Sequence, residues 1–338
     1  MNPGFQIQAF ESALKDRKAN LSKDKIRFKD LTPKGDNEFA MRGHGEVTLD
    51  EKALRQYLQY VNIPYSFYQN HCDREMQIYL IGRMSDGKNN DRLNPIIYKD
   101  EVIGWGSEFR PLVHLWDAYQ IVAGNLSTLG GELTIHGGTH YSQDTFVNSQ
   151  GGVISWSTDA LVTEPKVGDI TEGGIRMGIN DWMDVSPTLS FYVNRLICSN
   201  GMTMEYKYPT IEVESSSDKI LDEINRISQS LASEINEKIL LPWKHSASHD
   251  VDDPLAFAHS MAKDRGMGKR LADRFLENVT NMVQAGSGPW SMYDVINCLT
   301  AVQNEDNIRW SERERIQLIG AHETIDHTDR CRTCHHII

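Results

Sequence analysis

The stretch from Gly173 to Tyr208 constrains the fold most, because it is the longest run of the 338-residue chain with strand character. Within Ile175–Ile179 every second residue is apolar, the period expected of a strand with one face in a core. A second apolar run covers 189–197, and Asn200-Gly201 follows it as a dipeptide that accepts positive φ. A third strand is predicted over 202–208. The stretch therefore predicts antiparallel strands of one sheet.

Strands and helices are mixed through the rest of the first two thirds. A helix is predicted from Phe5 to about Lys18, either as core packing or as a subunit contact, and Met76–Met84 reads as a buried helix. A β-hairpin is predicted over 96–105, and strands separated by glycine pairs over 132–162. Because strands and helices do not alternate regularly, we expect an α+β fold with an antiparallel sheet packed with helices.

After Pro209 the pattern becomes helical. An apolar stripe at helical spacing runs from Ile220 to Leu240 and is expected to end at Pro242. Further helices are predicted over 254–263, 269–285 and 291–303. We therefore predict an α+β core over 1–212, a mainly helical region over 213–321 and a Cys/His tail over 322–338.

Charge and cysteine content limit the function classes. The net charge is −12, so the surface as a whole should repel phosphate, and nucleic-acid binding would need a local basic strip. No apolar run reaches the roughly 18 residues of a membrane span, and the N-terminus does not read as a secretory signal. We expect a cytoplasmic protein without membrane contact. Five cysteines favour reduced thiols over a disulfide framework.

The C-terminal tail is the most metal-like segment. Cys331 and Cys334 have the C-x-x-C spacing that lets two thiolates bind one Zn²⁺, and two imidazoles could come from His322, His327, His335 and His336, with His327 and His335 as the chosen candidates. The alternative is a tail whose Cys and His residues are incidental, since only one C-x-x-C is present. Zinc is the one cofactor that the sequence suggests.

Basic residues form two candidate nucleic-acid surfaces. One is the junction of two predicted helices around Gly266-Met267-Gly268, where interleaved acidic residues favour a solvated face with ion pairs as the alternative. The other combines sheet arginines with Trp105, Tyr192, Tyr206 and Tyr208, because stacked bases need aromatic faces beside cations. There the alternative is core aromatics and paired arginines. The candidate residues are Arg110, Arg176, Arg195, Lys207, Lys263, Arg265, Lys269 and Arg270.

Catalytic motifs are missing from the sequence. It contains no G-x-S-x-G, P-loop, H-E-x-x-H or G-x-G-x-x-G at a strand–helix junction, so we predict a non-enzymatic protein. Asp181 and Asp184 are two loop carboxylates that could bind a divalent cation, although such residues commonly form turns.

Three segments carry a family resemblance: Phe191–Met202, Gly106–Leu112 and Ser291–Asn297. They resemble a phage and plasmid family named only as domain of unknown function 932, over roughly Glu101 to Gln303. A more distant similarity links the chain to phage single-strand annealing proteins of the RecT, Red-beta and Erf type, which share an antiparallel sheet backed by helices. The resemblance implies a mobile-element origin and brings no established activity.

Two functions follow as hypotheses. The first is a DNA-metabolism protein of a phage or plasmid that binds or anneals single-stranded DNA as a homo-oligomer. The second is a viral interaction protein, such as a host-factor inhibitor or assembly component, whose acidic surface meets a basic partner. For Arg195 the sequence leaves two readings: a buried, paired arginine that supports the fold, or a phosphate-binding side chain in a groove.

Overall fold

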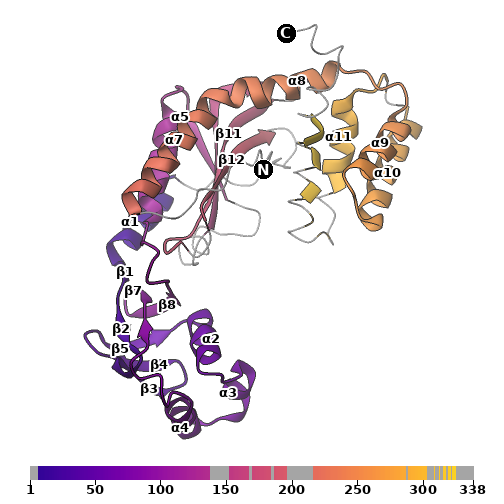
Figure 1. Cartoon of the computed structure of the whole chain (residues 1–338). Helices are drawn as coiled ribbons and strands as arrows, with labels where there is room; N and C mark the ends of the chain where they lie inside the picture. Colours follow the sequence, from indigo (N-terminus) through magenta and orange to yellow (C-terminus); the bar gives the residue numbers. More distant parts are fainter. Residues whose placement is uncertain are drawn as a thin grey trace.

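The computed structural model shows an α+β protein with two lobes (Figure 1). The predicted fold class is confirmed. The small lobe covers residues 21–110, and the large lobe consists of the N-terminal helix and the chain from 111 onward. The structure describes residues 7–137, 152–166, 170–183, 186–195, 216–286, 288–302 and single positions between 308 and 324.

The small lobe is built on a six-stranded sheet with the strand order β1-β7-β8-β5-β4-β3, in which only β5 and β8 are parallel. A separate two-stranded sheet pairs β2 with β6. The strands are β1 (Leu21–Lys23), β2 (Ile26–Arg27), β3 (Leu31–Gly35), β4 (Glu38–Met41), β5 (Gly45–Leu49), β6 (Arg92–Leu93), β7 (Pro95–Tyr98) and β8 (Glu101–Trp105).

Three helices complete the small lobe: α2 (Glu51–Tyr60), α3 (Tyr65–His71) and α4 (Arg74–Met84). Asp50 and Asp73 start α2 and α4, because each carboxylate accepts a hydrogen bond from a free backbone N–H of the first turn. The core of the lobe lies around Tyr57, whose ring stacks on Phe28 and Trp105.

The large lobe contains the four-stranded antiparallel sheet β12-β11-β10-β9. Its strands are β9 (Leu133–Gly137), β10 (Gly152–Thr163), β11 (Thr171–Ile179) and β12 (Thr188–Arg195). Its helices are α1 (Ile7–Asn20), α5 (Leu115–Ser127), α7 (Ser217–Ile235), α8 (Leu241–Ser248), α9 (Pro254–Asp264), α10 (Lys269–Gln284) and α11 (Met292–Ala301). None of the helices in the described part of the chain is long and apolar enough to cross a bilayer.

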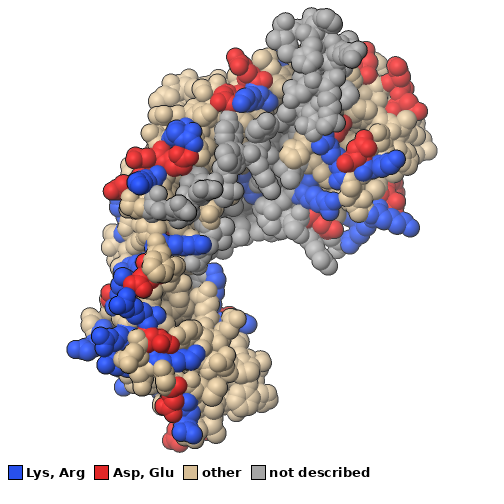
Figure 2. Space-filling model, viewed as in Figure 1, with Lys and Arg blue, Asp and Glu red and all other residues tan. Residues whose placement is uncertain are grey.

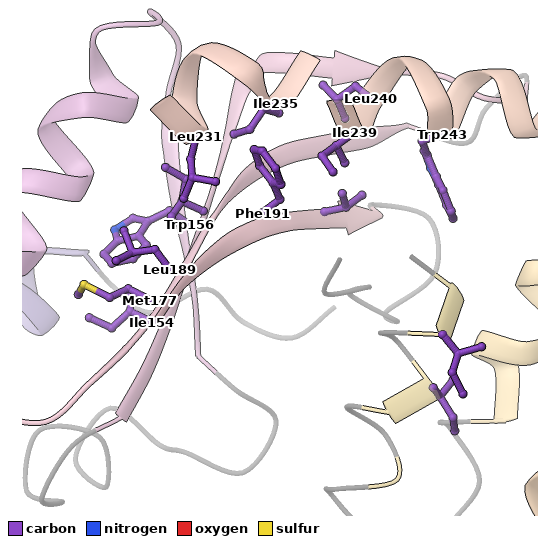
Figure 3. Packing of buried hydrophobic residues seen from close by; sticks show 14 of the residues in the cluster. Ile154, Trp156, Met177, Leu189, Phe191, Leu231, Ile235, Ile239, Leu240 and Trp243 are labelled. Carbon is purple, nitrogen blue, oxygen red and sulfur yellow. The ribbon is translucent and has the colours of Figure 1, made fainter. Parts of the chain in front are cut away.

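One face of this sheet is covered by α7 and the turn that follows it (Figure 3). Trp156, Met177 and Phe191 project from three neighbouring strands toward the apolar stripe of the helix. Gly173 lets the helix approach, because a Cβ there would lie 2.7 Å from the Ile235 side chain. β11 is a strand as predicted, but its second face is buried as well, since Arg176 there is only 6% exposed.

The sequence predicted that the helical stripe ends at Pro242, but the helical path continues through this residue. A π-helical turn over Asn236–Leu240 leads directly into α8. Pro242 is tolerated because it occupies the first turn of α8, and the wider turn before it relieves the clash that proline causes in a regular helix.

The hydrophobic cores do not separate at the predicted boundary between 212 and 213. The largest cluster joins the sheet of the large lobe with α1, α5 and helices from α7 to α11, because the sheet needs those helices to cover it. The small lobe has its own cluster, from Ile26 to Val102. A third, small cluster of Leu21, Ile96, Ile103 and Trp182 connects the lobes.

Helix α4 differs from its prediction as a buried helix. Only Gln77 and Ile81 are buried, whereas Met76, Ile78 and Tyr79 are exposed. The reason is that α4 packs mainly on β3, the edge strand of the small sheet, and is covered on one side only. The strands predicted over 140–148 and 202–208 lie outside the described residues.

Candidate nucleic-acid interface

Two arginines face each other across the smallest sheet. Arg27 of β2 is directly opposite Arg92 of β6, so both side chains point to the same side. Like charges in this position repel and destabilise a strand pair. The Arg27 guanidinium forms no ion pair within the described part of the chain. Arg27 is thus left with a cation opposite it and, among the described residues, no ion pair of its own, an arrangement suited to an external anion.

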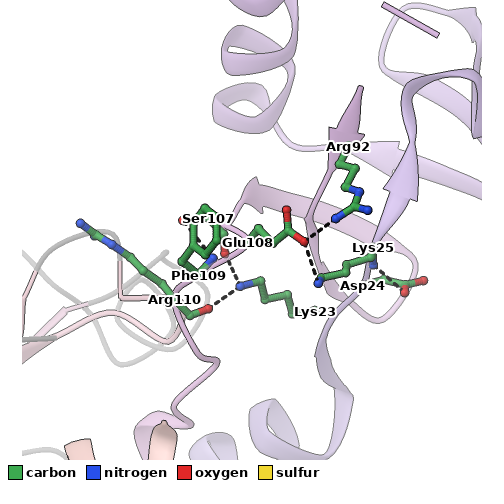
Figure 4. A network of polar contacts seen from close by, with 8 residues as sticks. All are labelled: Lys23, Asp24, Lys25, Arg92, Ser107, Glu108, Phe109 and Arg110. Carbon is green, nitrogen blue, oxygen red and sulfur yellow. Dashed lines mark hydrogen bonds and ion pairs between the residues drawn. The ribbon is translucent and has the colours of Figure 1, made fainter. Parts of the chain in front are cut away.

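Glu108 lies beside this pair and is shared between two cations (Figure 4). Its Oε1 is 3.0 Å from Lys25 Nζ and 2.8 Å from Arg92 Nη1. The hydrogen bond from Lys25 is the main reason that the pKa of Glu108 is lowered, so this carboxyl is ionised at neutral pH. Glu108 thus pairs with Lys25 and Arg92 and leaves Arg27 without a carboxylate partner in the described part of the chain.

Phe109, the next residue, is 92% exposed. Its loop is fixed at the backbone: Lys23 Nζ donates to the carbonyls of Ser107 and Arg110, and the Phe109 N–H donates to Ser107 Oγ. Gly106 permits this close path, since a Cβ there would lie 3.0 Å from the Ile96 side chain. An aromatic ring is therefore held out into solvent on an anchored loop. We call Lys25, Arg27, Arg92, Glu108 and Phe109 the junction patch.

The charge around the junction patch differs from that of the chain as a whole. Residues 21–110 contain 14 Lys and Arg and 14 Asp and Glu, so the entire net charge of −12 is carried by the rest of the chain. Figure 2 shows Lys and Arg side chains gathered over the part of the small lobe where Figure 1 places β2 and β5. Lys and Arg side chains thus gather locally in a lobe whose acidic and basic residues are equal in number.

Sequence reasoning missed the junction patch, although a signal was present. Every second residue from Lys23 to Lys29 is basic, which in extended chain places the cations on one side. The segment Gly106–Leu112 was noted in the sequence only for its family resemblance. Nothing in it indicated that Phe109 would be exposed rather than buried.

The predicted sheet arginines are used inside the fold. Arg110 follows Phe109, but its Nη1 donates to the carbonyl of Met183. Arg176 and Tyr192 share one face of the large sheet, and both are only 6% exposed. Burial raises the pKa of the Tyr192 hydroxyl, against the smaller opposing effect of Arg176. Trp105 belongs to the small lobe and donates to the Ala53 carbonyl. The sheet therefore does not present these residues together on an open surface.

Two predicted residues of the same set are not described fully. The backbone of Arg195 pairs with Thr171 at the end of β12, and its side chain lies outside the described residues. Lys207 lies outside them altogether, as do Tyr206 and Tyr208.

The predicted helical cluster occupies the turn between α9 and α10. Lys263, Lys269 and Arg270 are exposed there. Arg265 is 2.9 Å from the carboxylate of Glu323, and Arg315 donates to the carbonyl of Gly266. Part of the cluster thus holds the last described helical segment in place, which agrees with the ion-pair alternative for Arg265.

The metal predictions have two different outcomes. Cys331, Cys334, His327 and His335 all lie outside the described residues, so zinc binding stays a prediction. Within the described part of the chain, no three His, Cys, Asp or Glu side chains converge in a way that could hold a metal ion. Asp181 accepts hydrogen bonds from Arg17 and from the Leu115 N–H, so its oxygens are occupied by the fold.

Comparison of the chain with protein-family models, curated proteins and solved structures found no match. The resemblance to domain of unknown function 932 and to annealing proteins therefore stays a prediction, and any function must be argued from the site alone.

Proposed function

We propose that the protein binds single-stranded nucleic acid at the junction patch without catalysing a reaction. The single observation that carries this proposal is the 92% exposed ring of Phe109, which follows in sequence the carboxylate that pairs with Lys25 and Arg92. Cations that track a phosphate backbone and an aromatic face on which a base can stack are the two components of sequence-tolerant single-strand binding. Annealing and a role in phage or plasmid DNA metabolism are extensions that rest on the resemblance alone.

The test is binding of a fluorescent oligothymidine at several salt concentrations. Phe109→Ala should weaken binding by about 1–3 kcal/mol, or roughly 5- to 150-fold, because it removes one stacking platform. Arg27→Ala with Arg92→Ala should reduce the slope of log affinity against log salt by roughly 1.4, at about 0.7 per lost phosphate contact.

The matched control is Lys263→Ala with Lys269→Ala, which removes two exposed cations from the α9–α10 turn. This variant should bind like the wild type. If it loses affinity while the junction variants do not, the site lies at the α9–α10 turn. If the wild type does not bind oligothymidine at low salt, the proposed function is wrong.

A second candidate is an interaction protein with a basic partner. It is favoured by the 33 acidic against 21 basic residues outside the small lobe. Salt-sensitive binding of an oligolysine peptide, together with no binding of oligothymidine, would support this function instead.

A further inference from the structure

Helix α4 is apolar on the side that faces solvent. Gln77 and Ile81 form its buried side, and Tyr79, two positions from each, lies about 200° around the helix from both. Tyr79 is 60% exposed and Met76, one turn away, is 46% exposed. A surface helix normally places polar residues there, so an apolar outer side indicates a binding surface.

The outer side of α4 has a symmetric composition about Tyr79. Glu75 lies four residues before Tyr79 and Arg83 four residues after it, while Met76 and Gly82 lie three residues before and after. All four share the exposed side with Tyr79. A Cβ at Gly82 would have no neighbour within 4 Å, so the surface is open there. We call Glu75, Met76, Tyr79, Gly82 and Arg83 the α4 face.

The two charges of the α4 face are weakly used within one chain. Arg83 is 3.8 Å from Asp86, and that pair is exposed, so it contributes little. Glu75 forms no ion pair in the described part of the chain. Both charged groups are therefore available to a partner that offers the opposite charge in the right place.

We propose that α4 packs antiparallel against α4 of a second copy of this chain, with the two-fold axis beside Tyr79. A two-fold interface brings a residue and its counterpart into reciprocal contact. In this arrangement each Glu75 lies level with the Arg83 of the other copy, so the ion pair forms twice, and Gly82 leaves room for the approach of the second helix. The two tyrosine rings meet at the axis.

Charge also favours a second copy as the occupant. Gln56–Cys72, the run that leads to α4 and includes α3, contains no Asp, Glu, Lys or Arg, so this end of the molecule does not repel its own copy. The net charge of −12 lies outside the small lobe, and Figure 1 shows α4 at the end of that lobe away from the large lobe. Pairing through α4 keeps the two acidic lobes apart.

The first experiment is analytical ultracentrifugation over a range of protein concentrations. One helix pair buries less than the roughly 1,600 Å² of a standard interface, so we expect a dimer that dissociates on dilution. Glu75→Arg and Arg83→Glu should each weaken the dimer at least tenfold, because like charges then face each other. The double variant should restore it. A charge reversal at Glu223, a half-exposed residue paired with Arg226 on α7, is the matched control and should leave the dimer unchanged.

The second experiment places a cysteine on the axis. Tyr79→Cys should give a disulfide-linked dimer under mild oxidation, whereas Leu241→Cys, at an exposed apolar position of the large lobe, should not. A wild type that is monomeric at all concentrations, or a double charge variant that fails to restore the dimer, would overturn the proposal. Oligothymidine binding is measured separately, so this result does not depend on the proposed function.

Discussion

The two lobes differ in how they use charge. The small lobe is neutral overall, yet its surface carries cations, an exposed phenylalanine and exposed apolar side chains of α4. The large lobe carries the net charge of −12 and buries two of its arginines, Arg17 and Arg176, inside the fold. A charged side chain that is buried and paired within the fold is not accessible to a ligand. The lobe with the smaller net charge but accessible cations is therefore the better candidate for binding.

The lobes are joined by a few buried groups that belong to both. Arg17 of α1 donates through Nε and Nη2 to Asp181, at 3.0 and 2.8 Å, and both side chains are nearly inaccessible. The guanidinium also lies over the ring of Tyr98 in β7 of the small lobe. Trp182, the residue after Asp181, packs on Ile96 and Ile103. Predictions at these positions test whether the lobes are independent units.

The largest effect is expected for Arg17→Ala. It leaves the Asp181 carboxylate buried without its partner, so the free energy of unfolding should fall by about 3–5 kcal/mol. Lys18→Ala, which breaks the half-exposed pair with Asp117, is the control and should cost less than about 1 kcal/mol. Urea unfolding followed by circular dichroism measures both. Equal losses would mean that the Arg17–Asp181 pair does not stabilise the fold.

A smaller effect is expected for Trp182→Leu. The lost packing should lower the free energy of unfolding by about 2–3 kcal/mol. This loss lies between that of a conservative hydrophobic substitution and that of a truncation to alanine. Because Trp182 belongs to the cluster between the lobes, calorimetry should show one unfolding transition for the wild type and two for this variant. Trp243→Leu, inside the large core alone, should lower the melting temperature and keep one transition.

The sequence predicted what depends on local pattern. The hairpin of β7 and β8 and the strand β11 follow from periodicity and turn residues, and both are confirmed. The Arg17–Asp181 pair joins residues 164 positions apart, and no local signal links them. The wrong prediction that α4 is buried has the same cause. Its apolar residues correctly indicated a helix, but they did not indicate which side of the helix packs against a distant element.

The candidate site was harder to predict than the fold. An arginine has the same letter whether it bonds internally, as Arg110 does with a backbone carbonyl, or faces another arginine across a strand pair, as Arg27 does. The difference depends on strand register, which the sequence did not give for strands of two residues. The exposure of Phe109 depends on Lys23, a residue 86 positions away in sequence, which anchors its loop.

The smallest expected effect is a pH dependence at the lobe connection. His114 precedes α5, and its Nδ1 is buried without a hydrogen-bond partner in the described part of the chain. Burial lowers the pKa of His114 below its usual value of 6.5, although Asp181 and Asp117 act in the opposite direction. The unfolded chain therefore binds a proton more readily than the folded protein as pH falls through 6.5. The contribution of His114 to stability is complete above pH 6.5 and is lost on acidification toward the folded pKa.

This prediction is tested by comparing His114→Gln with the wild type at pH 7.5 and pH 5.5. The other histidines titrate in both proteins, so only the difference between them reports on position 114. The wild type should lose more stability than His114→Gln over this interval, in urea unfolding at each pH. An equal loss in the two proteins would show that His114 has the same proton affinity in the folded and unfolded states. A smaller loss in the wild type would show that folding raises the pKa of His114 instead of lowering it.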